Sequence, residues 1–218
     1  MSGGLKIEAV RPYKGKLFEV TLEDGSRLWL HADLIAEAGL RAGVSLSAEQ
    51  TEELRQKAAE HRTFEYALYL LELRAYSYRE LHDKLMRAKN AQEEAVEVTL
   101  AKLVRLGLLN DAQYAQQLAR QYAEVKQYGL RRAAYEMRHR GLSEADIEDA
   151  LAPYDDPERI SAQLLELMQK KYARYLSDPD DRRAVEKVTA ALVRRGFTYQ
   201  QIRFALEDYA AWLEEQAD

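Results

Sequence analysis

The spacing of hydrophobic residues changes near residue 33 of the chain. Before that point, apolar and polar positions alternate in three runs, residues 6–10, 17–22 and 27–30, as they do in strands with one buried face. The segment between the second and third runs contains Asp24-Gly25, a dipeptide that is favoured in tight hairpin turns. We therefore predict a small antiparallel sheet at the N-terminus.

Beyond residue 33 the apolar residues recur three and four positions apart, which is helical spacing. A short helix over residues 33–38 is predicted to end at Gly39, and residues 40–46 form a predicted connector. Ser47 and Gln50 have the spacing of a capping box, which opens a helix that we expect to run towards His61. From there to the C-terminus no segment has a convincing strand pattern.

Recurring cap and stop residues divide the helical part. Three further pairs have the spacing of reciprocal N-terminal caps: Ser77 with Glu80, Asn110 with Gln113, and Thr198 with Gln201. The predicted helix stops are Gly107, Gly129, Gly141 and Gly196. The segment 153–157, which begins and ends with proline, marks a further boundary.

An internal repeat lies in this helical part. An apolar anchor precedes a helix end, a residue suited to the left-handed conformation follows, and the next helix then buries two apolar residues. The three copies are Met137, Gly141, Ile147 and Leu151; Leu192, Gly196, Ile202 and Leu206; and Met86, Asn90, Val96 and Leu100. We interpret them as three related helical modules.

These patterns predict a mainly α fold. A small N-terminal antiparallel β-hairpin or sheet is followed by three tandem three-helix modules, which we expect to stack into an elongated, curved array. The predicted boundaries are residues 1–62 for the β-hairpin region with its linker helix, 63–109 for module 1, 110–152 for module 2 and 153–218 for module 3.

Composition narrows the class of protein. The 218 residues are 47% hydrophobic and 32% charged, too apolar for a disordered chain. The absence of cysteine excludes disulfides, thiolate metal sites and a cysteine nucleophile. No apolar run is long enough to span a membrane, and no secretory signal is evident, so we expect a soluble, cytoplasmic protein.

We find no pattern that indicates catalysis. The four histidines, His31, His61, His82 and His139, lack metal-ligand spacing in the sequence, and the common glycine-rich phosphate-binding and nucleophile motifs are absent. The sequence therefore predicts a protein that is not an enzyme, has no catalytic residues, and needs neither a cofactor nor a metal.

Basic residues indicate a function more clearly than any catalytic motif does, although the net charge is −5. Arg132, His139 and Arg140 fall on one side of a module 2 helix, and Lys187, Arg194 and Arg195 occupy the matched positions of module 3. Module 1 has Leu81, Ala88 and Lys89 there. We predict a basic stripe that binds a nucleic acid or phosphate-rich partner, with two tyrosines as stacking or contact residues. Its members are Arg131, Arg132, Arg138, Arg140, Arg182, Arg183, Lys187, Arg194 and Arg195, with Tyr128 and Tyr135 interleaved.

A structural interpretation of the same residues stays open. Arg140, Arg194, Arg195 and Lys89 lie close to predicted helix ends, where the helix macrodipole favours a positive charge. Most tyrosines, among them Tyr66 and Tyr114, stand at helical spacing beside leucine or alanine, as core residues do.

Four blocks of the sequence together resemble one family. Residues 77–85 fit S-x-x-E-L-x-x-K-L, and residues 106–115 resemble a segment L-G-[LY]-[LI]-[ND]-D-x-x-[FY]-A. Residues 129–142 resemble the following helix pair, and residues 194–198, with Ile202, fit R-R-G-F-[ST]. These are motifs of the bacterial RecX regulatory proteins, and they occur in the family's order. The N-terminal hairpin resembles the extension of longer RecX proteins.

The resemblance implies a modulator of the RecA recombinase. RecX proteins lie in the groove of the RecA–DNA filament and mostly inhibit filament growth, ATP hydrolysis and strand exchange, which tempers recombination, DNA repair and the SOS response. DNA would be bound weakly or within the filament. The alternative is an autonomous DNA-binding protein with tandem helix-turn-helix-like modules. Because no heptad seam is present, we expect a monomer.

Overall fold

The computed structural model describes residues 4–178 and 181–217 of the chain. Residues 1–3 of the predicted hairpin region, and residues 179–180 and 218 of the predicted module 3, lie outside this part. The chain forms two compact units. The first runs to Ala75 and includes Glu80–Leu109, and the second comprises Tyr76–Arg79 and the residues from Asn110 onwards.

A small antiparallel sheet opens the first unit, as predicted. Its strands are β1 (Leu5–Lys14), β2 (Leu17–Leu22), β3 (Arg27–His31) and β4 (Ser45–Leu46), in the order β3-β2-β1-β4. The hairpin turn between β2 and β3 is confirmed, since Gly25 has φ +79° and its N–H donates to the Leu22 carbonyl over 2.9 Å. The connector predicted over residues 40–46 is wrong at its end, because Ser45 and Leu46 pair with β1 as β4.

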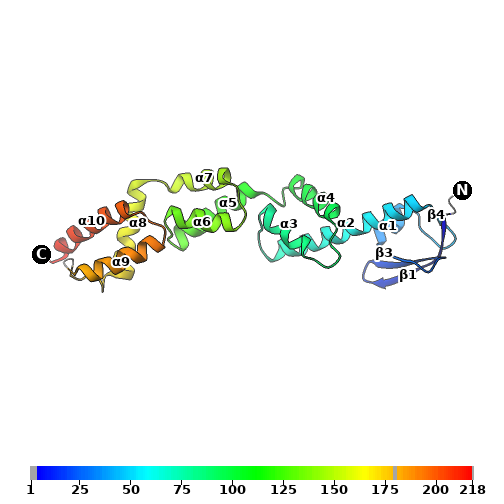
Figure 1. Cartoon of the computed structure of the whole chain (residues 1–218), viewed down its shortest axis with the longest axis horizontal. Helices are drawn as coiled ribbons and strands as arrows, with labels where there is room; N and C mark the ends of the chain where they lie inside the picture. The colour runs from blue at the N-terminus through cyan, green and yellow to red at the C-terminus, as the bar shows by residue number, and fades with distance from the viewer. Residues whose placement is uncertain (1–3, 179–180, 218) are drawn as a thin grey trace. The chain divides into compact units, whose positions relative to one another are not determined.

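Among the described residues, α1 to α4 complete the first unit (Figure 1). They are α1 (Ala32–Glu37), α2 (Ala48–Leu73), α3 (Tyr78–Met86), which belongs to this unit from Glu80 onwards, and α4 (Glu93–Arg105). The predicted capping box opens α2: Ser47 Oγ accepts from the Gln50 N–H, and Gln50 Oε1 accepts from the Ser47 N–H over 2.8 Å. The predicted end near His61 is wrong, because α2 continues to Leu73 without a break.

The α2 helix contributes buried residues at two places along its length. Leu54, near its start, is buried in the core of the sheet with Leu28 and Leu30. Its later residues Ala67 and Leu70 are also buried, where α2 packs against α4. One long helix therefore connects the sheet to the first group of helices.

The repeat predicted for the first helical group is correct with one exception. Asn90 has φ +60°, and Val96 and Leu100 are fully buried, as the pattern predicts. Met86, however, is 36% exposed, and its neighbour Leu85 is buried instead. The apolar anchor is thus one residue earlier than the alignment of the three copies indicates.

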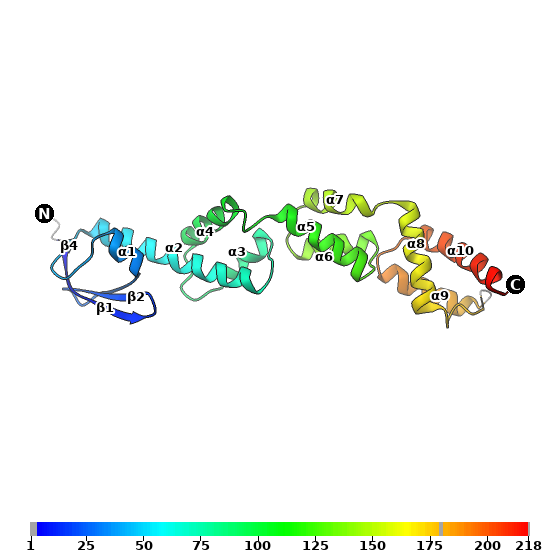
Figure 2. The same cartoon turned by 180° about the vertical axis from the view of Figure 1, so that it is seen from behind.

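In the described part of the second unit, α5 to α10 form two further groups of three helices (Figure 2). The first comprises α5 (Asp111–Arg120), α6 (Leu130–His139) and α7 (Glu144–Leu151), and the second comprises α8 (Pro157–Leu167), α9 (Arg182–Arg194) and α10 (Tyr199–Ala217). Short turns of other helix types are η1 (Gln121–Val125), η2 (Ala152–Tyr154) and η3 (Met168–Tyr172). The two cores are built around Met137 and Leu192, and Leu130 packs against both. The mainly helical fold with a small N-terminal sheet is thus confirmed, and no strand occurs after β4 in the described residues.

Three of the four predicted glycine stops are correct. Gly107, Gly141 and Gly196 follow helices and have φ of +70°, +77° and +99°. Gly129 is not a stop: its φ is −70°, and it is the N-cap of α6. The left-handed residue of that loop is Gln127, at φ +53°. Gly129 instead lies where a side chain has no room, as described below.

Candidate functional site

The middle helices of the second unit, α6 and α9, begin with arginines. Arg131 and Arg132 lie in the first turn of α6, and Arg182 and Arg183 open α9. Neither helix has an acidic residue in its first turn, whereas α2, α4, α5, α7 and α8 all do. Because the helix dipole is positive at the N-terminus, it disfavours a cation there. The macrodipole therefore does not account for these four arginines.

Other members of the predicted stripe lie at the opposite ends of the same two helices. Arg138 is in the last turn of α6 and Arg140 is its C-cap, while Arg194 and Arg195 occupy the matching places in α9. A cation at a helix C-terminus is stabilised by the dipole. For this half of the stripe, helix stabilisation is a sufficient physical reason.

The predicted binding residues Arg138 and Arg195 have structural partners. Arg138 donates to both carboxylate oxygens of Glu144, over 2.5 and 2.7 Å, and this hydrogen-bonded pair lowers the pKa of Glu144 and raises that of Arg138. The Arg195 guanidinium donates to the Lys126 carbonyl over 3.0 Å and to the Gln127 carbonyl over 3.4 Å. It thereby joins the end of α9 to the loop before α6.

The predicted tyrosines lie beside Arg132. The guanidinium of Arg132 is 5.9 Å from the ring centroid of Tyr128 and 5.3 Å from that of Tyr135, and it is also paired with Glu136. Tyr128 stacks on the buried ring of Tyr122. Tyr135 is 50% exposed, so it is the better placed of the two for contact with a partner.

Five other members of the stripe project without partners. Among the residues that the structure describes, these exposed side chains make no ion pair or hydrogen bond. We call them the unpaired basic set: Arg131, Arg182, Arg183, Lys187 and Arg194. Since a charge without a protein partner is available to an anion, this set is the part of the stripe best suited to binding.

A close backbone approach joins α6 to α9. The Gly129 N–H donates to the Arg195 carbonyl over 2.8 Å, and a Cβ on Gly129 would lie 2.5 Å from the carbonyl carbon and oxygen of Gly196. A Cβ on Gly196 would lie 2.5 Å from Cβ of Arg132. The C-terminal end of α9, which carries Arg194, thus lies against the N-terminal end of α6, which carries Arg131.

The sequence predicted that Gly196 adopts the left-handed conformation, but it did not predict the contact of Gly196 with Arg132 or the role of Gly129. Gly129 could have been recognised as a different kind of glycine, because no helix ends immediately before it. A second instance occurs inside the same unit, where a Cβ on Gly141 would lie 2.8 Å from Cβ of Arg79. There, Ser77 Oγ donates to the Arg140 carbonyl, and the Tyr78 N–H donates to Asp111 Oδ1 over 2.7 Å.

Comparison with known proteins agrees with the four sequence blocks. A family model described as RecX, second three-helix domain, matches residues 110–151, and one described as RecX, third three-helix domain, matches residues 158–206. The Regulatory protein RecX of Prosthecochloris aestuarii is 34% identical over 142 residues, which cover 65% of this chain and 89% of that protein. The chain belongs to the RecX family of regulatory proteins. The resemblance found in the sequence is therefore confirmed.

Other RecX proteins match nearly the whole chain. The Regulatory protein RecX of Enterococcus faecalis is 27% identical over 214 residues, covering 97% of this chain and 79% of that one. A crystal structure of regulatory protein RecX superposes with a TM-score of 0.72 at 23% identity, covering 93% of this chain and 99% of the other. RecX from Lactobacillus salivarius gives 0.63 at 24% identity, covering 70% and 97%. These two structures show the shared fold.

The RecX relatives are named as regulatory proteins, which places this chain among regulators. In the described part of the chain, no helix combines the length and the apolar character needed to cross a membrane.

Proposed function

We propose that this RecX-family chain binds the RecA filament on DNA and restrains filament growth, ATP hydrolysis and strand exchange. The observation that carries the proposal is the unpaired basic set on α6 and α9. These helices belong to the two domains that the RecX family models match. A filament of RecA on DNA offers phosphates, and an acidic protein surface would attract the same side chains.

The position of the arginines at helix starts favours a binding role for them over a purely structural one. Arg131 and Arg183 each lie where the helix dipole costs stability, and neither has a partner among the described residues. An external anion would offset that cost. Lys187, in the second turn of α9, extends the same exposed charge.

The deciding experiment measures RecA ATPase on single-stranded DNA as purified chain is added. We expect suppression at substoichiometric ratios, because a bound regulator that blocks filament growth affects many RecA subunits. The chain alone should bind naked DNA weakly, in keeping with its net charge of −5. An ATPase rate that is unchanged at an equimolar ratio would refute the proposal.

The alternative is an autonomous DNA-binding protein. Its support is that a three-helix domain with arginines at the start of its middle helix could contact duplex phosphates directly. This alternative predicts tight binding to naked duplex DNA, with an affinity that falls steeply as salt rises. Fluorescence anisotropy on duplex DNA at several salt concentrations, without RecA, separates the two functions.

Charge-neutral variants test the basic set itself. Arg131, Arg182, Arg183 and Lys187 are changed together to Gln. Arg194 is kept because the helix dipole accounts for a cation at the end of α9, and Arg195 is kept because it hydrogen-bonds to the loop before α6. We expect the concentration needed for half-suppression of RecA ATPase to rise about tenfold or more.

The matched control changes four exposed basic residues that have acidic partners, so that both variants lose the same formal charge. These are Arg27, Arg55, Lys57 and Arg203, paired with Glu19, Glu52, Glu53 and Glu207. The control should keep nearly wild-type potency. Equal potency of the two variants, both shown to be folded by circular dichroism, would move the binding surface away from α6 and α9.

A further inference from the structure

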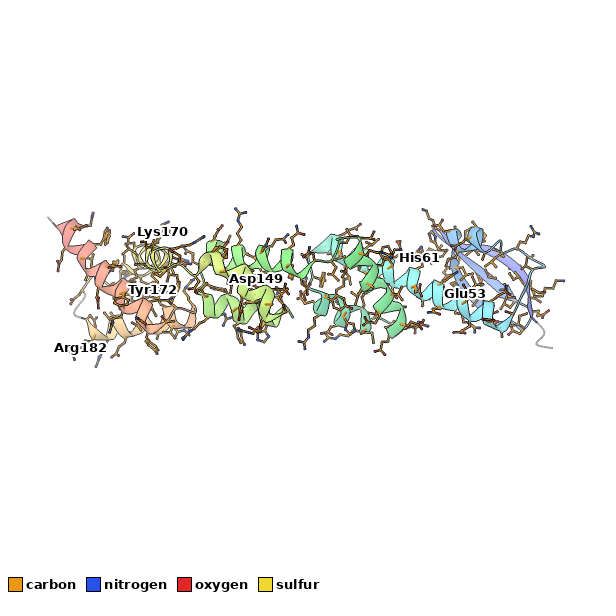
Figure 3. All side chains as sticks on the ribbon, turned by 90° about the horizontal axis from the view of Figure 1, so that it is seen from above. Glu53, His61, Asp149, Lys170, Tyr172 and Arg182 are labelled. Atoms are coloured by element: carbon orange, nitrogen blue, oxygen red, sulfur yellow. The ribbon has the colours of Figure 1, made fainter. Side chains whose placement is uncertain are left out.

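A histidine pair and a carboxylate meet where the sheet of the first unit joins its helices. His31 is the last residue of β3 and the N-cap of α1, Asp33 is in the first turn of α1, and His61 lies on α2, on which Figure 3 labels it. One potential ligand atom from each residue lies within 4.8 Å of the other two. Among the described residues, no other group of three such side chains comes together in this way.

Tertiary packing, not local sequence, assembles this group. His31 and His61 are thirty positions apart, so the sequence shows no metal-ligand spacing. They meet because Leu54 of α2 packs into the sheet core with Leu30 of β3. The two imidazole rings stack with centroids 4.2 Å apart and planes inclined by 20°.

The Nδ1 atom of His31 lies close to two polar groups of Asp33. His31 Nδ1 accepts a hydrogen bond from the Asp33 backbone N–H over 3.3 Å, so this nitrogen presents its lone pair towards α1. Asp33 Oδ2 lies 3.1 Å from the same nitrogen. A proton on Nδ1 would make the contact between Nδ1 and Oδ2 a hydrogen bond, and a metal ion bound to both atoms would bridge them instead.

We propose that His31, Asp33 and His61 bind a divalent late transition metal ion, with Zn²⁺ as the best fit. Two imidazole nitrogens and one carboxylate oxygen are a common ligand set for Zn²⁺, with water completing a tetrahedron. Bonds of about 2.0–2.2 Å place tetrahedral ligand atoms about 3.3–3.5 Å apart. Because a metal ion lies in the plane of each imidazole that binds it, one of the two stacked rings would have to turn out of the stack to reach that spacing. Nitrogen donors disfavour Mg²⁺ and Ca²⁺, which prefer oxygen ligands.

The bound ion would join the end of β3 and the start of α1 to the middle of α2. It would therefore stabilise the attachment of the sheet to the long helix, by the mass action of a ligand that binds the folded state. This inference concerns the first unit and is independent of the RecA-binding proposal, which concerns residues of the second.

The test is a calorimetric titration of the full-length chain, stripped with EDTA, with ZnCl₂ at neutral pH. We expect about one ion per chain, with a rise of several degrees in the melting temperature on saturation. Asp33→Asn should weaken binding about tenfold or more, and this variant should fold because the Asp33 side chain is 79% exposed. His61→Gln should weaken it similarly.

His82→Gln is the control, since His82 lies near the carboxylates of Asp83 and Glu97 but belongs to no group of three ligands. It should bind Zn²⁺ as the wild type does, and so should the variant in which Arg131, Arg182, Arg183 and Lys187 are changed to Gln. MgCl₂ should give no comparable heat. Zn²⁺ binding at well under one ion per chain, or equal affinity of the wild type and Asp33→Asn, would overturn the proposal and leave a direct hydrogen bond between His31 and Asp33 as the reason for the short contact.

Discussion

At the scale of single residues, the glycines that follow helices are of two kinds. Gly107 and Gly196 both have positive φ, but a Cβ on Gly107 would meet no atom within 4 Å, whereas one on Gly196 would collide with Arg132. The first glycine meets a conformational need only. The second also allows two backbones to approach.

This difference predicts different costs for Gly107→Ala and Gly196→Ala. Left-handed backbone at an alanine costs about 1–2 kcal/mol in either place. Overpacking adds about 1–3 kcal/mol, and only at Gly196, because Arg132 backbone and Cβ atoms cannot yield as a flexible side-chain tip could. Urea unfolding of the two variants measures both costs, and equal losses would contradict the proposed steric role of Gly196.

The same distinction explains what the sequence could predict about these positions. The left-handed residues Asn90, Gly141 and Gly196 were all identified from the repeat, since helix ends have a local signature. The sequence could not distinguish Asn90, which tolerates a side chain, from the two glycines that do not. That difference depends on residues 79 and 132, which are far away in sequence.

At the scale of helices, the arginines in the first turns of α6 and α9 lower the stability of those helix starts. Arg182 and Arg183 lie next to the N-cap Asp181, whose carboxylate accepts from the backbone N–H groups of Arg183 and Ala184. The cap stabilises the helix start, and the two arginines oppose it through the dipole.

We therefore predict that Arg182→Gln with Arg183→Gln raises the free energy of unfolding, by about 0.3–1 kcal/mol for each cation removed from the first turn. The same double variant should suppress RecA ATPase less well. Thermal or urea unfolding checks the rise in stability, and the ATPase assay checks the loss of suppression. A variant that is both less stable and less active would indicate that the arginines support the fold and would weaken the case for binding.

Element boundaries show where prediction from sequence succeeds. Caps with a side-chain signature were found, including the reciprocal bonds of Thr198 with Gln201. The passage of α2 beyond His61 was missed although residues 62–73 contain no glycine or proline, and the absence of such a stop is itself the signal that the helix continues. The two-residue strand β4 is too short to show alternation, and pairing with β1 alone defines it. Which basic residues have acidic partners was also beyond sequence reasoning, as Arg138 and Glu144 show.

At the scale of the whole molecule, we predict that the free chain is a monomer. A net charge of −5 opposes self-association, and no heptad seam is present in the sequence. Light scattering at micromolar concentration should give the 25.1 kDa mass of one chain. If the mass is doubled, this prediction is wrong. The half-exposed Val104, Leu106 and Leu108 at the end of α4 would then be the first residues to replace by polar ones.

The meeting of Gly129 with Gly196 also has a consequence for protein engineering. Its hydrogen bond joins two main-chain groups, the Gly129 N–H and the Arg195 carbonyl, so this contact itself does not depend on side-chain identity, although a donor must also accept Leu130, which packs against both cores. A seam of this kind is suited to grafting. The last three helices of a distant relative could be exchanged at residue 157, provided that the donor ends its middle helix with the Arg-Gly pair and the recipient keeps glycine at 129. Such chimaeras would allow the surface of one module to be varied while its attachment to the next stays fixed.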